Sequence, residues 1–75
     1  MLWVVAEREK DIGPEEKIKL LRAFSNKNDA KRFIEQYLRK NKIERLNYYE
    51  EENEFGYFSD DNWYVIFAQK VKFER

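Results

Sequence analysis

An apolar segment opens the chain, and charged residues follow it directly. Residues 2–6, Leu-Trp-Val-Val-Ala, are mostly β-branched or aromatic, and residues 7–9 are charged. Such residues favour strands, so the pattern predicts a strand that begins at Leu2. Residues 11–14, Asp-Ile-Gly-Pro, have the composition of a reverse turn, because glycine tolerates a positive φ and proline fixes φ near the value that a turn needs.

Residues 15–24 fit two patterns. As a strand, Ile18, Leu20, Arg22 and Phe24 fall on one side and alternate with Lys19, Leu21 and Ala23. As a helix, Pro14 occupies the first position and two glutamates follow it at the positive end of the helix dipole. We favour the strand, because a new helix start follows at once and a longer helix would have to end at Ser25 without glycine or proline. The helical reading stays open at this point.

The strongest local pattern predicts a helix over about residues 27–41. Asn26 has the side chain of an N-cap, and Asp29 stands three residues later, as in a variant of the capping box. Cationic residues occupy the last turn, where the dipole favours them. The apolar residues recur with helical spacing and form a one-sided stripe of Ala30, Phe33, Ile34, Tyr37 and Leu38.

After residue 42 the pattern predicts two strands with a turn-rich segment between them. Residues 43–51 alternate in character, and residues 63–69 are apolar on both faces, so the final strand should be central in the sheet and extends toward Val71 and Phe73. The segment between these strands contains Gly56 and several polar turn residues. Three aromatic residues within it are candidates for a hairpin arm: Phe55, Tyr57 and Phe58.

These elements predict a single α+β domain over residues 1–75, with ββαββ order and an antiparallel sheet that carries the 27–41 helix on one face. One helix covers only one face of a sheet, whereas the strands are apolar on both sides. An uncovered aromatic face is typical of an interface, so we expect a protein-binding or regulatory module, either a homodimer or a domain that docks another protein. The candidate anchors are Trp3, Tyr49, Tyr64 and Ile66.

Composition limits how this small domain can be stabilised and where it works. The 75 residues include neither cysteine nor histidine, which rules out disulfides and the commonest zinc sites, whereas thirteen aromatic residues supply apolar area. A chain without cysteine fits a reducing compartment, and the apolar start is too short for a signal peptide, so we expect a cytoplasmic protein. No apolar run approaches the length of a membrane span.

The residue types of catalysis are scarce. Without histidine and cysteine the commonest proton shuttle and the best nucleophile are missing, and Ser25 and Ser59 lie in turn-like contexts. The carboxylates of residues 50–54 and 60–61 lie in a polar stretch that predicts a solvated surface, and their spacing does not match a calcium loop. We therefore expect no enzymatic activity, no cofactor and no metal site.

Charge is unevenly distributed along a chain of zero net charge. Residues 1–16 carry −3, residues 17–45 carry +7 and residues 46–75 carry −4. Either these segments lie side by side and neutralise one another, or the basic middle segment binds a ligand. The alternative function is therefore nucleic-acid binding, with phosphate contacts from the helix and stacking by a tyrosine. The candidate residues are Lys31, Arg32, Arg39, Lys40, Lys42, Arg45 and Tyr48.

Overall fold

The computed structural model describes residues 1–10 and 16–72, so the predicted turn at residues 11–14 and the extension to Phe73 lie outside the described residues. It contains five strands and one helix over this part of the chain. In order these are β1 (Leu2–Lys10), β2 (Glu16–Phe24), α1 (Lys27–Lys40), β3 (Asn47–Glu50), β4 (Glu54–Phe58) and β5 (Tyr64–Val71).

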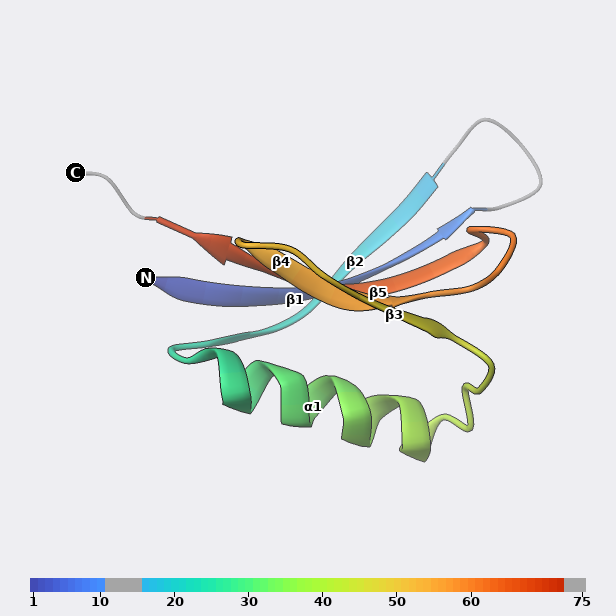
Figure 1. Cartoon of the computed structure of the whole chain (residues 1–75), viewed down its shortest axis with the longest axis horizontal. Helices are drawn as coiled ribbons and strands as arrows, with labels where there is room; N and C mark the ends of the chain where they lie inside the picture. Colours follow the sequence, from blue (N-terminus) through green and yellow to red (C-terminus); the bar gives the residue numbers. More distant parts are fainter. Residues whose placement is uncertain (11–15, 73–75) are drawn as a thin grey trace.

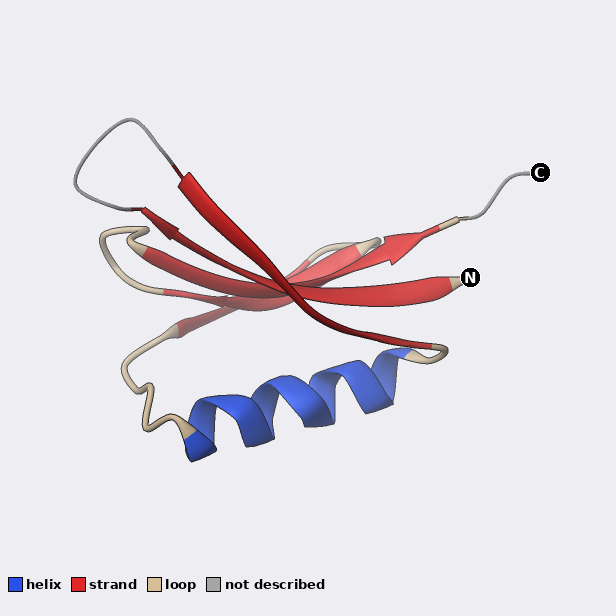
Figure 2. Cartoon of the chain, turned by 180° about the vertical axis from the view of Figure 1, so that it is seen from behind, coloured by secondary structure: helices blue, strands red, loops and turns tan. Residues whose placement is uncertain are grey.

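The strands form one antiparallel sheet in the order β2-β1-β5-β4-β3, and α1 packs on one side of it (Figures 1 and 2). This arrangement confirms the predicted α+β class, the antiparallel sheet and the single main helix. It also confirms the central place of the last strand, since β5 lies between β1 and β4. The predicted ββαββ order is one strand short, because the candidate hairpin arm around Phe55 forms a separate strand, β4.

The core lies between α1 and the sheet. From the helix, Ala30, Ile34 and Leu38 are buried, and they occupy one side of it as the predicted stripe requires. Alternate residues of the central strands meet them, and these residues form one cluster with the helix. The sheet contributes Trp3 and Val5 from β1, Phe55 from β4, and Tyr64, Ile66 and Ala68 from β5.

Residues 16–24 form a strand, as the sequence favoured. β2 pairs with β1 from Lys10↔Glu16 to Trp3↔Phe24, and the register shifts between Val5 and Ala6. On the β2 side, Arg22 pairs with Val5 and Leu20 pairs with Ala6, so Leu21 is the extra residue of a bulge. The bulge places Leu21 against the core cluster and leaves Leu20 on the other face of the sheet.

The helix begins where the capping pattern predicted. Asn26 is the N-cap, and its Oδ1 accepts a hydrogen bond from the Asp29 backbone N–H at 2.8 Å. The two side chains also contact each other, since Asn26 Nδ2 donates a hydrogen bond to Asp29 Oδ2 at 2.8 Å. Asn26 therefore satisfies one of the backbone N–H groups that the helix start leaves without a partner, and a side-chain hydrogen bond holds the cap in place.

The strand predicted over residues 43–51 is wrong in its first half. β3 comprises only Asn47–Glu50, and the preceding loop contains Lys42 and Arg45 with φ of 55° and 63°. A left-handed residue cannot continue a strand, so the chain turns twice before β3 begins. Ile43 and Leu46 still pack against the core cluster, but they do so from a loop.

Within the described part of the chain, α1 is the only helix, and it is neither long nor apolar enough to cross a membrane.

Candidate functional site

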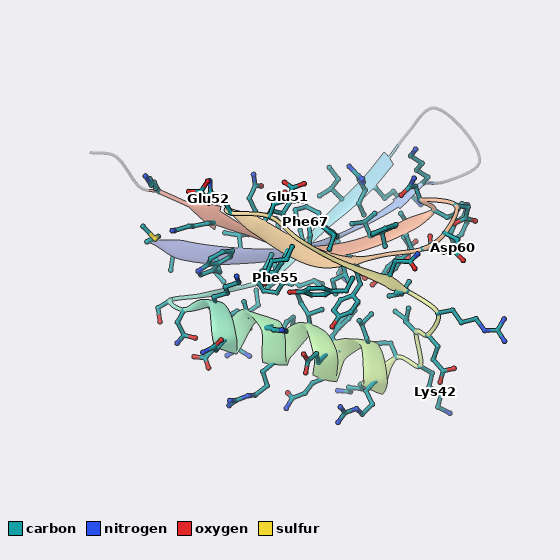
Figure 3. The ribbon with its side chains drawn as sticks, viewed as in Figure 1. Lys42, Glu51, Glu52, Phe55, Asp60 and Phe67 are labelled. Carbon is teal, nitrogen blue, oxygen red and sulfur yellow. The ribbon has the colours of Figure 1, made fainter. Side chains whose placement is uncertain are left out.

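The side of the sheet opposite α1 is apolar and has no covering element among the described residues. Figure 3 shows the two faces on neighbouring strands, since Phe55 points toward the helix and Phe67 points away from it. We call the outer side the open face. Its most exposed apolar side chains are Ile18 and Leu20, which are 61% and 73% exposed. Strand register and alternation place six further apolar residues beside them: Leu2, Val4, Ala6, Val65, Phe67 and Val71.

The open face becomes polar toward β3. A shallow hollow there is lined by Arg8, Tyr49, Glu54 and neighbouring residues. The Tyr49 hydroxyl donates a hydrogen bond to the Glu54 carboxylate at 2.5 Å. Burial, this hydrogen bond and the charge of Glu54 all raise the pKa of Tyr49, and the positive charge of Arg8 opposes the shift. The hollow therefore presents a fixed pair of polar groups beside an apolar surface.

The four predicted anchors lie on different faces. Tyr49 is on the open face, but Trp3, Tyr64 and Ile66 are 7%, 8% and 0% exposed and belong to the core beneath α1. Their prediction as interface anchors is therefore corrected. The period-two pattern separated the two faces of β1 and β5 properly, but it does not say which of the two faces a helix covers. In β2 it failed, because the bulge at Leu21 puts Phe24 and Leu20 on opposite faces.

Two of the corrected anchors have specific roles within the core. The rings of Trp3 and Phe55 lie 5.5 Å apart, and Lys27 Nζ lies 5.8 Å and 5.6 Å from their centroids. The Tyr64 hydroxyl donates to Glu7 Oε2 at 2.9 Å, and the Tyr37 hydroxyl donates to the same carboxylate at 3.1 Å. These contacts join the helix to β1 and β5, so they serve the fold.

The predicted nucleic-acid residues do not converge on one surface. Lys31 lies over the ring of Tyr48, with Nζ 5.3 Å from its centroid, on the flank of the helix that faces β3. Arg32 and Lys40 line grooves on the opposite flank, beside β2. The remaining three candidates, Arg39, Lys42 and Arg45, are exposed at the end of α1 and in the loop after it.

Basic and acidic segments are neighbours in space. This supports the interpretation that the basic middle segment is partly neutralised by the acidic segments on either side of it in the sequence. Lys27 and Glu50 form an ion pair at 3.1 Å, and the contact with Lys27, followed by the hydrogen bond from Tyr48, lowers the pKa of Glu50. In the register of β1 and β2, Lys19 lies opposite Glu7 and Lys17 lies opposite Glu9. The acidic residues of β1 therefore lie beside the first lysines of β2.

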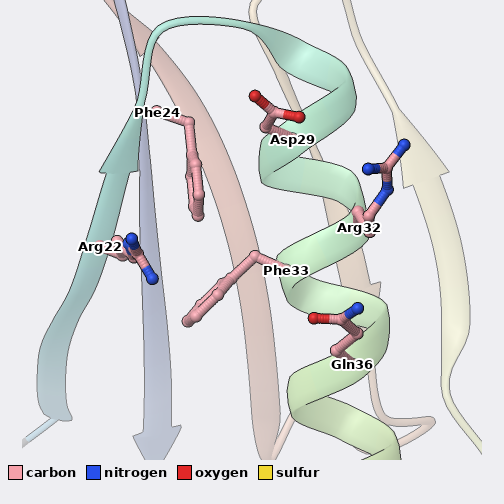
Figure 4. Close-up of a pocket in the computed structure, with 6 residues that line it drawn as sticks. All are labelled: Arg22, Phe24, Asp29, Arg32, Phe33 and Gln36. Carbon is pink, nitrogen blue, oxygen red and sulfur yellow. The ribbon is translucent and has the colours of Figure 1, made fainter.

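The flank of α1 that faces β2 forms a groove that the sequence did not reveal. Phe24 of β2 and Phe33 of α1 lie between the two elements, with ring centroids 5.4 Å apart, and Arg22 stands over Phe24 at 5.3 Å (Figure 4). Phe33 also stacks on Tyr37 at 6.0 Å. We call this the β2–α1 groove. Its lining comprises Arg22, Phe24, Asp29, Arg32, Phe33, Gln36, Tyr37 and Lys40.

Other surface residues have local structural partners. The Ser59 hydroxyl donates to Asp61 at 2.8 Å and accepts from the Tyr64 backbone N–H at 3.0 Å, so it stabilises the turn before β5. Ser25 is exposed in the connection between β2 and α1. Over residues 1–10 and 16–72, no group of three or more acidic side chains is arranged to hold a metal ion.

A sequence signal for the open face was present in residues 17–20. Lys17 and Lys19 alternate with Ile18 and Leu20, and this pattern places both apolar residues on one side of a strand. The β2–α1 groove had no such signal, because it depends on how the helix is placed beside the sheet. No protein-family model matches the chain, and neither the curated proteins nor the solved structures include a significant match to it.

Proposed function

We propose that this chain is a non-enzymatic protein-binding module that forms a homodimer through the open face of its sheet. The observation that carries the proposal is the exposure of Ile18 and Leu20 on a face that no described element covers. Burial of apolar area is the main driving force of association, and contiguous apolar patches on small proteins mark interfaces.

A second copy fits this face in shape and in charge. Two sheets pack face to face when their inner sides are apolar, and a two-fold interface requires a surface that complements itself. The face carries charges of both signs, among them Arg8 and Glu54, so two copies are not repelled through a single sign of charge. The dimer would have two sheets at its centre and one helix layer on each outer side.

The size of the face is also adequate. Figure 1 looks down the shortest axis and shows the sheet nearly edge-on, with the strands running along the longest axis. The extents of the whole domain along these two axes are 20 Å and 39 Å, which are upper limits for the sides of the face. A standard interface buries about 800 Å² on each partner, and a face with sides of these lengths is of that order.

Nucleic-acid binding has less support than self-association. Its candidate residues are divided among the two flanks of α1, its end and the loop after it, and Lys31 lies over Tyr48, whose hydroxyl donates to Glu50. Salt-dependent phosphate binding needs several cations that track one backbone.

The test is the oligomeric state of matched variants, measured by light scattering after size-exclusion chromatography. Leu20→Glu places a charge in the proposed interface, so we expect it to be a folded monomer where the unmodified chain is a dimer. Tyr48→Glu is the control, because Tyr48 is also exposed, at 42%, but lies on the helix side of β3. The proposal is contradicted if the unmodified chain is monomeric at high concentration. It is also contradicted if both substitutions dissociate the dimer equally.

A further inference from the structure

From the free edge of β2 and the β2–α1 groove beside it, we infer that this chain binds an extended, acidic peptide segment of a partner protein as a sixth strand. β2 is the terminal strand of the sheet and pairs only with β1 among the described elements. Its other side presents backbone N–H and C=O groups to which an extended chain can bind. The inference does not require the proposed homodimer, although Ile18 and Leu20 take part in both: the homodimer would cover them on the open face, and the peptide would lie beside them at the edge of the sheet.

The chemistry of the partner follows from the two faces of β2. On the helix side, the strand carries exposed Arg22, Phe24 at the end of the groove, and Lys19, which lies opposite Glu7 of β1. On the outer side it carries Ile18 and Leu20, both exposed. Because neighbouring strands place side chains of the same face side by side, a complementary peptide alternates acidic and apolar residues.

The groove adds both attraction and contact area on the helix side. Arg22, Arg32 and Lys40 line it, and Asp29 is the one acidic residue of its lining. Its floor is aromatic, formed by Phe24, Phe33 and Tyr37, all half-buried. Acidic side chains of the peptide would reach the cations at the rim, while their methylene groups pack on the rings.

The same charges argue against a second copy at this edge. Antiparallel pairing of β2 with itself would bring basic side chains of the helix side next to the same residues of the other copy. Like charges on adjacent positions destabilise a sheet, and edge lysines are a common device against self-pairing. An acidic strand reverses the sign of each of these contacts.

The test uses an end-blocked peptide, as long as β2, that alternates valine and glutamate. Titration into the ¹⁵N-labelled protein should shift the backbone amides of β2 and of the α1 residues that line the groove. A peptide that alternates valine and lysine should leave them unchanged. Two further acidic peptides, N-methylated at the odd or at the even positions, separate strand pairing from simple attraction, because only one set of amides faces β2.

Arg22→Glu should weaken binding of the acidic peptide by about tenfold or more, since one attractive rim contact becomes repulsive. Arg39→Glu is the matched control, because Arg39 is an exposed cation of α1 that does not line the groove. We expect that one of the two N-methylated peptides does not bind, and that Arg39→Glu leaves the affinity for the acidic peptide unchanged.

Several results would overturn the inference. These are unshifted β2 amides at millimolar acidic peptide, equal binding of the lysine peptide, equal binding of both N-methylated peptides, or equal effects of the two substitutions. Stronger shifts with a single-stranded oligonucleotide would make the groove a nucleic-acid site instead.

Discussion

Gly56 on β4 lies directly opposite Phe67 on β5, and the two backbones approach so closely that a side chain at Gly56 has no room. An ideal Cβ at this position would lie 2.2 Å from the carbonyl oxygen of Ile66 and 2.7 Å from Phe67 Cα. Both are backbone atoms, which cannot rotate away as the end of a long side chain can. On the other side Gly56 pairs with Tyr49, so it separates two aromatic residues of the open face.

We therefore expect Gly56→Ala to destabilise the domain by roughly 1–3 kcal/mol or more, since 1–3 kcal/mol is typical of overpacking. The usual stabilising effect of replacing glycine in a strand should not appear, because the close approach outweighs the entropy gain. Urea unfolding followed by tryptophan fluorescence measures the change. An unchanged or higher midpoint would contradict the close β4–β5 approach.

The N-cap supports a second stability prediction. Asn26→Ala removes the acceptor for the Asp29 backbone N–H and the donor to the Asp29 carboxylate, and we expect a loss of about 1 kcal/mol. Asn28→Ala is the control, since Asn28 is an exposed residue of the first helical turn and alanine is the better helix former there. If both substitutions lower the unfolding free energy equally, the cap does not hold the helix start.

The hydroxyls that meet at Glu7 predict a loss of stability in alkali. Burial, the hydrogen bond to Glu7 and the charge of Glu7 raise the pKa of Tyr64, and the same causes raise the pKa of Tyr37. A raised folded-state pKa means that the stability is complete below the ordinary tyrosine pKa of about 10 and is lost as the pH rises above it. The unfolding free energy should therefore fall in alkaline solution.

Tyr64→Phe tests this assignment. At neutral pH the variant loses a hydrogen bond worth about 1 kcal/mol, and above about pH 10 its stability should decline less steeply than that of the unmodified chain. Lysines titrate in the same range, but their contribution cancels when the two proteins are compared at each pH. Parallel stability curves for the two proteins would show that Tyr64 does not couple to Glu7 in this way.

Much of the fold could be predicted from the sequence, because its main elements follow strong local patterns. The apolar stripe from Ala30 to Leu38 and the cap at Asn26 defined the helix to within one residue at its end. The segment that begins at Trp63 is apolar on both faces, and this pattern predicted the central strand. The prediction of a strand at residues 43–46 was wrong, because an alternating pattern does not reveal residues with left-handed backbone such as Lys42 and Arg45.

The candidate site was less accessible to sequence reasoning. Counting faces predicted a surface that the helix leaves uncovered, and the sheet has one. The choice of Trp3, Tyr64 and Ile66 as its anchors failed, because nothing in the period-two pattern distinguishes the covered face from the open one. Large aromatic residues were preferred as anchors, whereas the most exposed apolar side chains of the open face are Ile18 and Leu20, which alternate with lysines.

Sedimentation equilibrium of the unmodified chain at neutral pH and near-physiological salt tests the central claim most directly. The monomer has a mass of 9.3 kDa. Association through the open face predicts an average mass that rises with concentration toward twice this value, and a dimer that salt does not dissociate, because apolar contacts hold it. A mass that stays at 9.3 kDa at every concentration would contradict the proposed homodimer.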